Sequence, residues 1–281
     1  MNAIGVIGVG FVGTAIREGF AHAVRVETYD RNPSKRTCDS VEDLVKKTDG
    51  PIFVAVPTPM RPDGSCDTSI IESVCRDIDR VSGSTGRILI LKSTIVPGTT
   101  AKLALAFPNL RFVFNPEFLT EANPINDFKN QKFVVLGASD REAFREVELL
   151  YARAFPDAAV FWKGWGEAEA FKYVANTFLA LKVAFSNEVY NLCQALGLDH
   201  GEIISIAQLD PRLGATHWVV PGPDGKRGFS GSCFPKDLNA LISLARERGV
   251  SLRTLEAAWA TNLEVRPEKD WESLKGRAVV A

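Results

Sequence analysis

The sequence predicts an α/β protein: a doubly wound, parallel, Rossmann-type sheet followed by an all-helical domain with one long helix. Two observations predict this fold. In the first half of the chain, short apolar runs rich in β-branched residues alternate with stretches that suit helices. After Gly164–Gly166 this alternation ends, and Glu167–Leu196 contains neither Gly nor Pro. Apolar runs without strict alternation are typical of strands covered on both faces, and a repeated strand–helix order is typical of a doubly wound sheet.

Seven runs have the composition of buried strands, in the order Ile4–Val9, Val24–Tyr29, Ile52–Val56, Ile88–Lys92, Phe112–Phe114, Phe133–Leu136 and Ala158–Phe161. Helices are expected between most of them, for example at Thr14–His22 and Ser69–Val81. The stretch Glu167–Leu196 is expected to form a single helix that leaves the first domain and builds the second.

The rest of the chain is predicted to form a loop, two helices and the beginning of a strand. The loop is rich in Gly and Pro and runs from Pro211 to Pro235. Helices are expected at Lys236–Arg248 and Leu252–Leu263, and Leu274–Val280 has the composition of an opening strand.

Composition and charge exclude several classes of protein. The residues are 46% hydrophobic and 24% charged, as in globular proteins, and the net charge of −1 argues against a general nucleic-acid binder. No apolar run approaches the roughly 20 residues of a membrane span, and no basic segment precedes the first apolar stretch, so we expect a cytoplasmic protein. The five cysteines are scattered and fit a reducing compartment, and four of them are expected to be small buried hydrophobes. Because the three histidines are far apart and no Cys/His cluster occurs, no metal site is expected.

A glycine motif between the first strand and the first helix predicts a dinucleotide site. Gly8-x-Gly10-x-x-Gly13 provides a tight turn, a close approach of the backbone to a pyrophosphate, and close packing of helix on strand. Asp30 ends the second strand, where a carboxylate accepts hydrogen bonds from the adenosine ribose and repels a 2′-phosphate. The sequence therefore predicts NAD rather than NADP.

Further polar residues follow two later strands. Lys92-Ser-Thr-Ile-Val-Pro-Gly98 and Asn115-Pro-Glu-Phe-Leu-Thr-Glu121 both begin where a predicted strand ends. Ligands of such sheets bind beyond the carboxyl ends of the strands, so Thr94, Glu117 and Glu121 are well placed to contact one.

The second domain carries two more polar segments. Lys172 and Asn176 are spaced by four residues in the long helix and therefore share a face, where both could donate to one developing oxyanion. Cys233 lies among glycines just before a helix that begins near Pro235, and Lys236 is close to it. This setting should lower the pKa of the thiol, and Asp237 could hold a water or take a proton.

Together these segments resemble the UDP-glucose/GDP-mannose dehydrogenase family, and above all its members that oxidise UDP-glucose. The combination is specific although each part alone is not. The matching stretches run in the family's order and cover almost the whole chain: Gly8–Gly13, Val56–Pro59, Lys92–Ile95, Asn115–Glu121, Lys172–Asn176, Asp210–Gly214 and Gly231–Asp237.

The resemblance implies that a nucleotide-sugar C6 alcohol is oxidised to the carboxylate by NAD without release of the aldehyde. It implies that Cys233 forms a thiohemiacetal and then a thioester, while Lys172 and Asn176 stabilise the oxyanions. Asp237 would act as a base through water, and Glu121 and Thr94 would position the hydrolytic water.

The resemblance also implies which residues bind cofactor, substrate and a second subunit. The cofactor would contact Gly8, Gly10, Phe11, Val12, Gly13, Asp30, Thr94, Glu121 and Lys236. The substrate would contact Glu117, Phe118, Leu119, Lys172, Asn176 and Gly231. Arg212 would reach the neighbouring subunit's site, because the family forms homodimers through the long helix.

On this basis the chain has three predicted parts. Residues 1–165 form an NAD-binding Rossmann domain, residues 166–265 a helical dimerisation domain with the catalytic cysteine, and residues 266–281 the stub of a missing C-terminal domain. The loop before Cys233 departs from the family, because Pro223–Arg227 looks like an insertion and Ser230 replaces a usual glycine. Lys226 and Arg227 are either phosphate ligands or solvated charges.

Two other functions stay open. A 3-hydroxyacid dehydrogenase also joins a Rossmann domain to a long helix with a Lys-x-x-x-Asn pair, but it needs no cysteine. A non-catalytic NAD-binding partner of a full-length dehydrogenase would need no nucleotide lid, but it would have no use for Lys172, Asn176, Cys233 and Asp237 together.

Overall fold

The chain forms two compact units. The computed structural model describes all residues from Met1 to Ala281. The first unit contains Met1–Thr58 and Thr68–Lys172, and the second contains Pro59–Asp67 and Tyr173–Ala281. The division falls inside the long helix rather than before it, and the second unit includes a short segment from the first half of the sequence. These two units differ from the predicted domain ranges 1–165, 166–265 and 266–281. The domain ranges stay a prediction.

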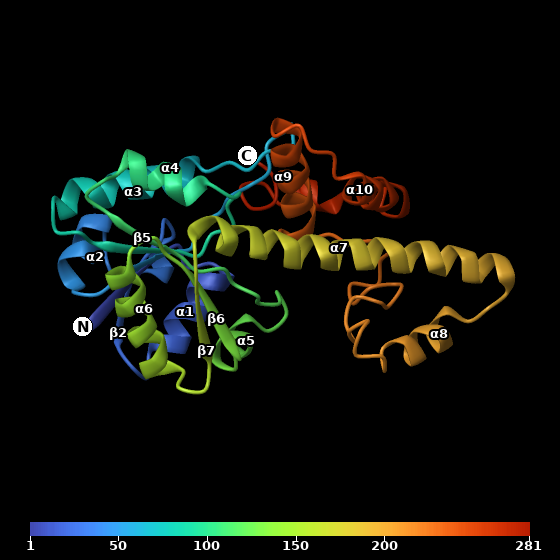
Figure 1. Cartoon of the computed structure of the whole chain (residues 1–281), viewed down its shortest axis with the longest axis horizontal. Coiled ribbons are helices and arrows are strands. Elements are labelled where there is room, and N and C mark those ends of the chain that lie inside the picture. The colour runs from blue at the N-terminus through green and yellow to red at the C-terminus, as the bar shows by residue number, and fades with distance from the viewer. The chain divides into compact units, whose positions relative to one another are not determined.

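A seven-stranded sheet is the centre of the first unit, as Figure 1 shows. Its strands are β1 (Ala3–Ile7), β2 (Arg25–Tyr29), β3 (Ile52–Val54), β4 (Ile88–Leu91), β5 (Arg111–Phe114), β6 (Phe133–Gly137) and β7 (Ala159–Lys163). They lie in the order β2-β1-β3-β4-β5-β6-β7. All neighbouring strands are parallel except β5 and β6, which pair antiparallel through Phe114 and Gly137. The predicted α/β Rossmann-type fold is confirmed, and the correction is that β6 and β7 run opposite to the other strands.

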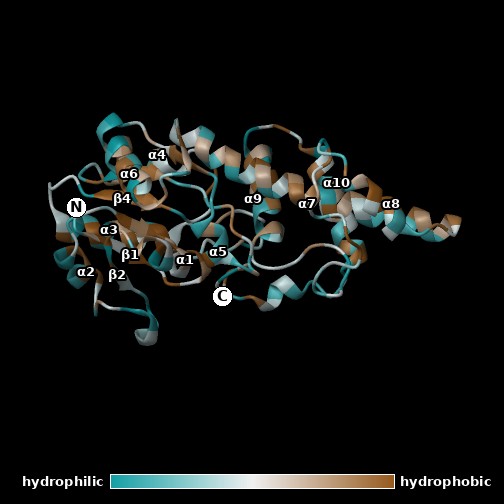
Figure 2. Ribbon diagram, turned by 90° about the horizontal axis from the view of Figure 1, so that it is seen from below, coloured by the Kyte–Doolittle hydropathy of each residue, from teal (hydrophilic) through white to brown (hydrophobic).

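Six α-helices and a 3-10 turn, Pro33–Lys35, connect these strands. The helices are α1 (Phe11–Phe20), α2 (Val41–Lys47), α3 (Ser69–Ser82), α4 (Thr99–Ala106), α5 (Pro124–Lys129) and α6 (Arg141–Ala154). One core joins the sheet to α1, α5 and α6, and the other joins it to α2, α3 and α4. In β3 the side chain of Phe53 belongs to the first core, while Ile52 and Val54 belong to the second. Because both faces of the central strands β1, β3 and β4 are covered, these three strands are apolar throughout, and Figure 2 shows brown ribbon in this sheet.

The long helix α7 spans Trp165–Leu196 and continues from the first unit into the second. Near its start, the buried carboxylate of Glu169 accepts hydrogen bonds from the backbone N–H groups of Gly98 (2.6 Å) and Thr100 (2.8 Å). These two donors lie at the N-terminus of α4. The N-cap residue of that helix is Gly98, which has no side chain to accept hydrogen bonds from them. Glu169 therefore ties the loop after β4 to α7.

The second unit is helical apart from its loops. It contains most of α7 together with α8 (His200–Ala207), α9 (Phe234–Glu247), α10 (Arg253–Val265) and a 3-10 turn, Asp270–Ser273. Its core consists of Ala180, Ala184, Phe229, Leu238, Ile242 and Ala258. None of the helices of the chain, α7 included, has the length and apolar character needed to cross a membrane.

The predicted strand at Leu274–Val280 is wrong. This segment folds back on itself, with a bridge between Lys275 and Val279, and forms no ladder of its own. Its backbone instead pairs with Met60, which donates to Ala278 O (2.9 Å) and accepts from Val280 N (3.0 Å). The composition of a strand shows only that a segment can adopt an extended conformation. In this protein the backbone of the segment pairs with a single residue of a loop that is distant in the sequence.

Candidate active site

The turn between β1 and α1 fits a dinucleotide. Gly8 has a φ of +89°, and a Cβ at Gly13 would lie 1.9 Å from the carbonyl oxygen of Gly8, so neither position accepts a side chain. A Cβ at Gly10 would meet nothing within 4 Å, which leaves open space above the turn. No side chain caps the N-terminus of α1, and its first turn holds no acidic residue. The positive end of the helix is therefore available to a phosphate.

Asp30 lies beside this turn, directly after β2. One of its carboxylate oxygens accepts the backbone N–H of Val9 (2.6 Å) and the other accepts that of Asn32 (2.8 Å). Each oxygen retains further acceptor capacity, so the group is held in place and can still bind the two hydroxyls of a ribose. The exposed ring of Phe11 and the adjoining Val12 form the first turn of α1.

A buried ion pair joins α7 to the segment after β5. Lys172 Nζ donates to the backbone oxygen of Glu117 (2.6 Å) and to Glu117 Oε1 (2.8 Å). Glu117 Oε2 accepts the backbone N–H of Leu119 (2.8 Å). Burial alone would raise the pKa of the Glu117 carboxyl, but Lys172, the Leu119 amide and Lys92 together lower it below its usual value. Glu117 is therefore a carboxylate inside the protein, and it holds Lys172 in place.

A second polar cluster surrounds the first turn of α9. Cys233 is the N-cap residue of this helix, and its backbone oxygen accepts the N–H of Asp237 (2.9 Å). The Asp237 carboxylate, 1% exposed, accepts from Asn176 Nδ2 (2.6 Å) and is ion-paired with Lys236. Asn176 and Lys172 are one turn apart on α7, but here Asn176 binds Asp237 and Lys172 binds Glu117.

Lys236 lies close to more than one negative group. Burial alone would lower the pKa of its ammonium, but attraction to Asp237 and to the thiolates of Cys233 and Cys66 raises it above its usual value. Because such attraction is mutual, the charge of Lys236 favours the thiolate form of a neighbouring cysteine.

The cysteines differ in exposure. Cys38, Cys75 and Cys193 are buried, whereas Cys66 and Cys233 are partly exposed. The expectation of four buried cysteines is therefore corrected to three. Cys66 lies in the loop Pro59–Asp67, which belongs to the second unit and not to the interior of the sheet domain. Burial raises the pKa of Cys75 to about 12, so that thiol is unreactive near neutral pH.

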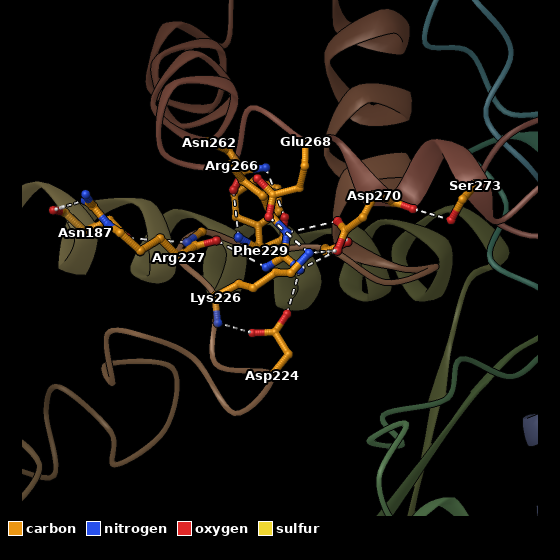
Figure 3. A network of polar contacts seen from close by, with 12 residues as sticks. Asn187, Asp224, Lys226, Arg227, Phe229, Asn262, Arg266, Glu268, Asp270 and Ser273 are labelled. Carbon is orange, nitrogen blue, oxygen red and sulfur yellow. Dashed lines mark hydrogen bonds and ion pairs between the residues drawn. The ribbon is translucent and has the colours of Figure 1, made fainter.

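A network of charged side chains supports the loop that leads to Cys233, as Figure 3 shows. Arg266, at the end of α10, is 2% exposed and binds the carboxylates of Asp224 and Asp270 (both 2.6 Å) and the backbone oxygen of Arg227 (3.1 Å). Ser230 donates its hydroxyl to Asp270. The amide of Asn262 pairs with both backbone groups of Phe229, at 2.7 and 3.0 Å.

Lys226 and Arg227 belong to the same network. Lys226 is ion-paired with Glu268 (3.2 Å) and Asp270 (3.4 Å). Arg227 donates to Asn187 and Asn191 of α7 and lies over the ring of Tyr190, 5.1 Å from its centroid. Both side chains therefore have partners within the chain.

The remaining predicted site residues lie in loops. Thr94 is buried after β4, and its backbone oxygen accepts the hydroxyl of Thr58 (2.7 Å). Phe118 and Glu121 lie in the segment after β5, where Glu121 is exposed. Gly231, with a φ of +78°, precedes Cys233 by two residues. Arg212 extends from the loop after α8 with 86% of its side chain exposed and is paired with Asp210.

Sequence reasoning did not assign a role to several buried polar residues near these sites. Lys92, which directly follows β4, donates to Asn115 Oδ1 (3.0 Å) and to the backbone oxygen of Pro116 (3.3 Å). Asn262 and Arg266 hold the loop before Cys233. The sequence signal that could have identified Lys92 is a charged residue directly after an apolar strand. The structure contains no group of three or more His, Cys, Asp or Glu residues that could hold a metal ion.

Comparisons with known proteins agree with this geometry. Residues 36–155 match the model of the UDP-glucose/GDP-mannose dehydrogenase family, NAD binding domain, and residues 166–264 match that of the family's central domain. The UDP-glucose 6-dehydrogenase of Haloferax volcanii is 31% identical in an alignment that covers 98% of this chain and 72% of the relative. That of Pseudomonas aeruginosa is 36% identical over 80% of this chain and 52% of the relative. The chain thus spans 72% of the first of these relatives and about half of the second.

Solved structures give the same result. A UDP-glucose dehydrogenase from Pyrobaculum islandicum is similar with a TM-score of 0.84 and 31% identity, over 94% of this chain and 68% of that one. A 3-hydroxyisobutyrate dehydrogenase from Mycobacterium tuberculosis has a TM-score of 0.75 over 96% of this chain and 95% of that one, but at 17% identity this likeness shows the fold alone. The glycine turn with Asp30, the matched family models and the identity to the Haloferax enzyme lead to one conclusion: the chain belongs to the UDP-glucose/GDP-mannose dehydrogenase family and carries its NAD-binding domain.

Proposed function

We propose that the chain oxidises the C6 alcohol of a nucleotide sugar to the carboxylate with NAD, as in the conversion of UDP-glucose to UDP-glucuronate, and that Cys233 is its covalent nucleophile. The observation that carries the proposal is the first turn of α9. There a partly exposed thiol at the N-cap is followed by a lysine and by a buried carboxylate that binds Asn176. The relatives named as UDP-glucose dehydrogenases support this substrate class.

The setting of Cys233 favours covalent catalysis for electrostatic reasons. Lys236 supplies a positive charge, and the N-terminal end of α9 supplies a partial one. Both favour the thiolate, which is the reactive form of cysteine. A buried cysteine such as Cys75 lacks these groups, and burial disfavours its thiolate.

The proposed reaction needs a group that retains the aldehyde between two oxidations. When bound, NAD would accept a hydride in each of them. The alcohol first loses a hydride and its hydroxyl proton and becomes an aldehyde. The Cys233 thiolate then adds to the aldehyde carbon, which forms a C–S bond and an oxyanion. Loss of the second hydride from this carbon leaves a thioester, and attack by water breaks the C–S bond and restores the thiolate. One water enters and three protons leave, so the reaction balances.

Other residues would stabilise charge and position groups. Lys172 and Asn176 would donate to the oxyanions from adjacent turns of α7. Asp237 would take a proton from the attacking water, which Glu121 and Thr94 would position. The sugar would contact Glu117, Phe118, Leu119 and Gly231, and Arg212 would extend toward the site of a second subunit.

The test is the stoichiometry of NADH release with purified UDP- and GDP-sugars. The parent should release two NADH for each sugar oxidised. A hydroxyl at position 233 is far less ionised than a thiol and a poorer leaving group, so Cys233→Ser should lower turnover by about a thousandfold or more and stop near one NADH per sugar. Cys66→Ser is the matched control, because it removes the other partly exposed thiol beside Lys236 and should retain two.

Other outcomes point to the alternatives. If Cys233→Ser matched the parent in rate and stoichiometry, the covalent route would be wrong and a single-step oxidation of the 3-hydroxyacid dehydrogenase kind would be favoured. A parent that reduced no NAD with any nucleotide sugar, but did so when mixed with an inactivated full-length relative, would be a subunit that depends on its partner. A parent inactive in both assays would support the non-catalytic alternative.

A further inference from the structure

Lys92 is a buried lysine whose direct acceptors are neutral. It directly follows β4 and is 3% exposed. Its ammonium donates to Asn115 Oδ1 (3.0 Å) and to the backbone oxygen of Pro116 (3.3 Å), and it lies 5.6 Å from the ring centroid of Phe128. Removing an ammonium from water costs several kcal/mol even after the protein relaxes, and an apolar side chain would fill the end of a buried strand without that cost. A lysine at this position therefore needs an explanation other than packing.

The acceptors of Lys92 lie next to the ion pair of Glu117 and Lys172. Asn115, Pro116 and Glu117 are consecutive, and two lysines bind the last two carbonyls of this segment. Lys92 binds that of Pro116 and Lys172 binds that of Glu117, at 3.3 and 2.6 Å. The hydroxyl of Tyr151 on α6 also donates to Asn115 Oδ1. The segment that presents Glu117 to Lys172 is thus also held by Lys92.

The three charges are also coupled. Glu117 is the one carboxylate among the ionisable groups that face Lys92; the others are Lys172 from α7 and Tyr151 from α6. Burial lowers the pKa of Lys92 to about 7, attraction to Glu117 opposes this shift, and repulsion by Lys172 adds to it. In return, Lys92 is one of the groups that lower the pKa of Glu117.

We propose that Lys92 is a positioning residue of the active site: from the end of β4 it fixes the Asn115–Glu117 segment and helps to keep Glu117 ionised against Lys172. Its consequence for turnover rests on the proposed function, whereas the coupling of the three charges does not. Lys92 acts through Glu117 and Lys172.

The coupling can be measured without any substrate. In protein labelled with ¹³C in its glutamate carboxyl groups, the Glu117 signal is assigned by its loss in Glu117→Gln, and its pKa is followed by NMR. Lys92→Met should raise the pKa of Glu117 by about one unit, because one of two neighbouring cations is lost. Lys92→Arg, which keeps a charge, should leave it near the parent value. Lys102→Met, which removes an exposed lysine of α4, is the matched control and should have no effect.

A reciprocal measurement covers the case in which Lys92→Met does not fold. With ¹⁵N-labelled lysine, the ammonium of Lys92 can be titrated in variants that retain it. Glu117→Gln should lower the pKa of Lys92 and Lys172→Met should raise it, each by about one unit. Opposite shifts of this kind support the inference. If Glu117→Gln left the pKa of Lys92 unchanged, or the pKa lay at the ordinary lysine value of about 10.4, the inference would be overturned.

Measurement of the turnover rate provides a second test of the inference. Misplacement of the Glu117–Lys172 pair should lower kcat of Lys92→Met by about a hundredfold with little change in the KM for NAD, and Lys92→Arg should restore part of it. A kcat equal to that of the parent would overturn the positioning role. A parent without NAD-reducing activity would instead count against the proposed function, and the NMR titrations would still decide whether Lys92 is coupled to Glu117.

Discussion

Asp30 lies directly after β2 beside the glycine turn, and two backbone N–H groups, those of Val9 and Asn32, fix its carboxylate. Such a group can accept hydrogen bonds from the two ribose hydroxyls of NAD, but it repels the 2′-phosphate of NADP. The choice of cofactor therefore depends on a single side chain whose orientation is set by the backbone around it. Arg31, the next residue, is exposed and could attract a phosphate.

Calorimetric titration of both cofactors tests this reading. We expect NAD to bind the parent at least about tenfold more tightly than NADP, a difference of about 1.4 kcal/mol. Asp30→Ala should bring the two affinities close together, because both the acceptor and the repulsion are lost. Arg31→Ala is the neighbouring control and should leave the preference for NAD at least as strong. Equal affinities in the parent would rule out the role given to Asp30.

At the scale of the elements, the position of α9 depends on contacts with segments that are distant in the sequence. Its first turn carries Cys233, Lys236 and Asp237, and the loop that leads to it is attached to α10 by the side chains of Arg266 and Asn262. The nearby segment Pro223–Arg227 adds Asp224 and Lys226 to this network. The position of Cys233 therefore depends on contacts between segments about 30 to 45 residues apart in the sequence.

Arg266→Met tests the strength of this network. It removes a buried cation that binds two carboxylates and a carbonyl, and it should lower the free energy of unfolding at pH 7 by about 2 kcal/mol. The loss should be smaller than for a fully buried pair, because water reaches both Asp224 and Asp270. Urea denaturation measures it. Arg246→Met, which breaks the exposed pair with Glu256 at the other end of α9, is the control and should cost about 0.5 kcal/mol or less.

The effect of Arg266→Met on the free energy of unfolding should also depend on pH. Hydrogen bonds from Arg266, Ser230 and Lys226 outweigh the effect of burial and hold the pKa of Asp270 well below its usual range. A carboxyl group whose pKa is lower in the folded state stabilises the fold above its unfolded pKa of about 3.9. This contribution is lost as the pH falls through the folded value. The difference between parent and Arg266→Met should thus stay constant from pH 7 to about pH 4 and shrink as the pH falls further toward 2, and a constant difference below pH 4 would contradict the assignment.

At the scale of the whole molecule, α7 stands out because it carries a row of exposed apolar side chains. Large apolar side chains at Phe171, Phe178, Phe185 and Leu192 recur every seven residues, and each is exposed by 39% to 58%. Figure 2 shows apolar residues along much of this helix. A seam with this period is typical of helices that pack against another helix. We therefore propose that two copies associate through α7.

Sedimentation velocity tests this proposal. The parent should be a dimer at micromolar concentration, and the double change Phe178→Glu and Phe185→Glu should make it monomeric, because charges placed in an apolar seam are costly to bury. Leu105→Glu is the control: it places a charge at the most exposed large apolar side chain, on α4, and should leave the dimer intact. A monomeric parent would contradict the proposal.

The sequence by itself determined the features that depend on local spacing. The glycine turn follows from three glycines at fixed intervals, and the helix through Lys172 and Asn176 follows from thirty residues without Gly or Pro. The order of seven strands with helices between them followed from apolar runs, and so did the likeness to the family. Such patterns can be read because the backbone requirements of a turn, strand or helix involve neighbouring residues.

Only the tertiary structure decided which polar groups meet and which are buried. Lys92 binds residues 23 and 24 positions away, and Arg266 binds Asp224 at a separation of 42. The direction of β6, the partner of Leu274–Val280 and the partners of Lys226 and Arg227 within the chain were decided in the same way. The physical reason is that desolvation and Coulomb attraction depend on the groups that the folded chain brings within a few ångströms, and residue spacing does not contain that information.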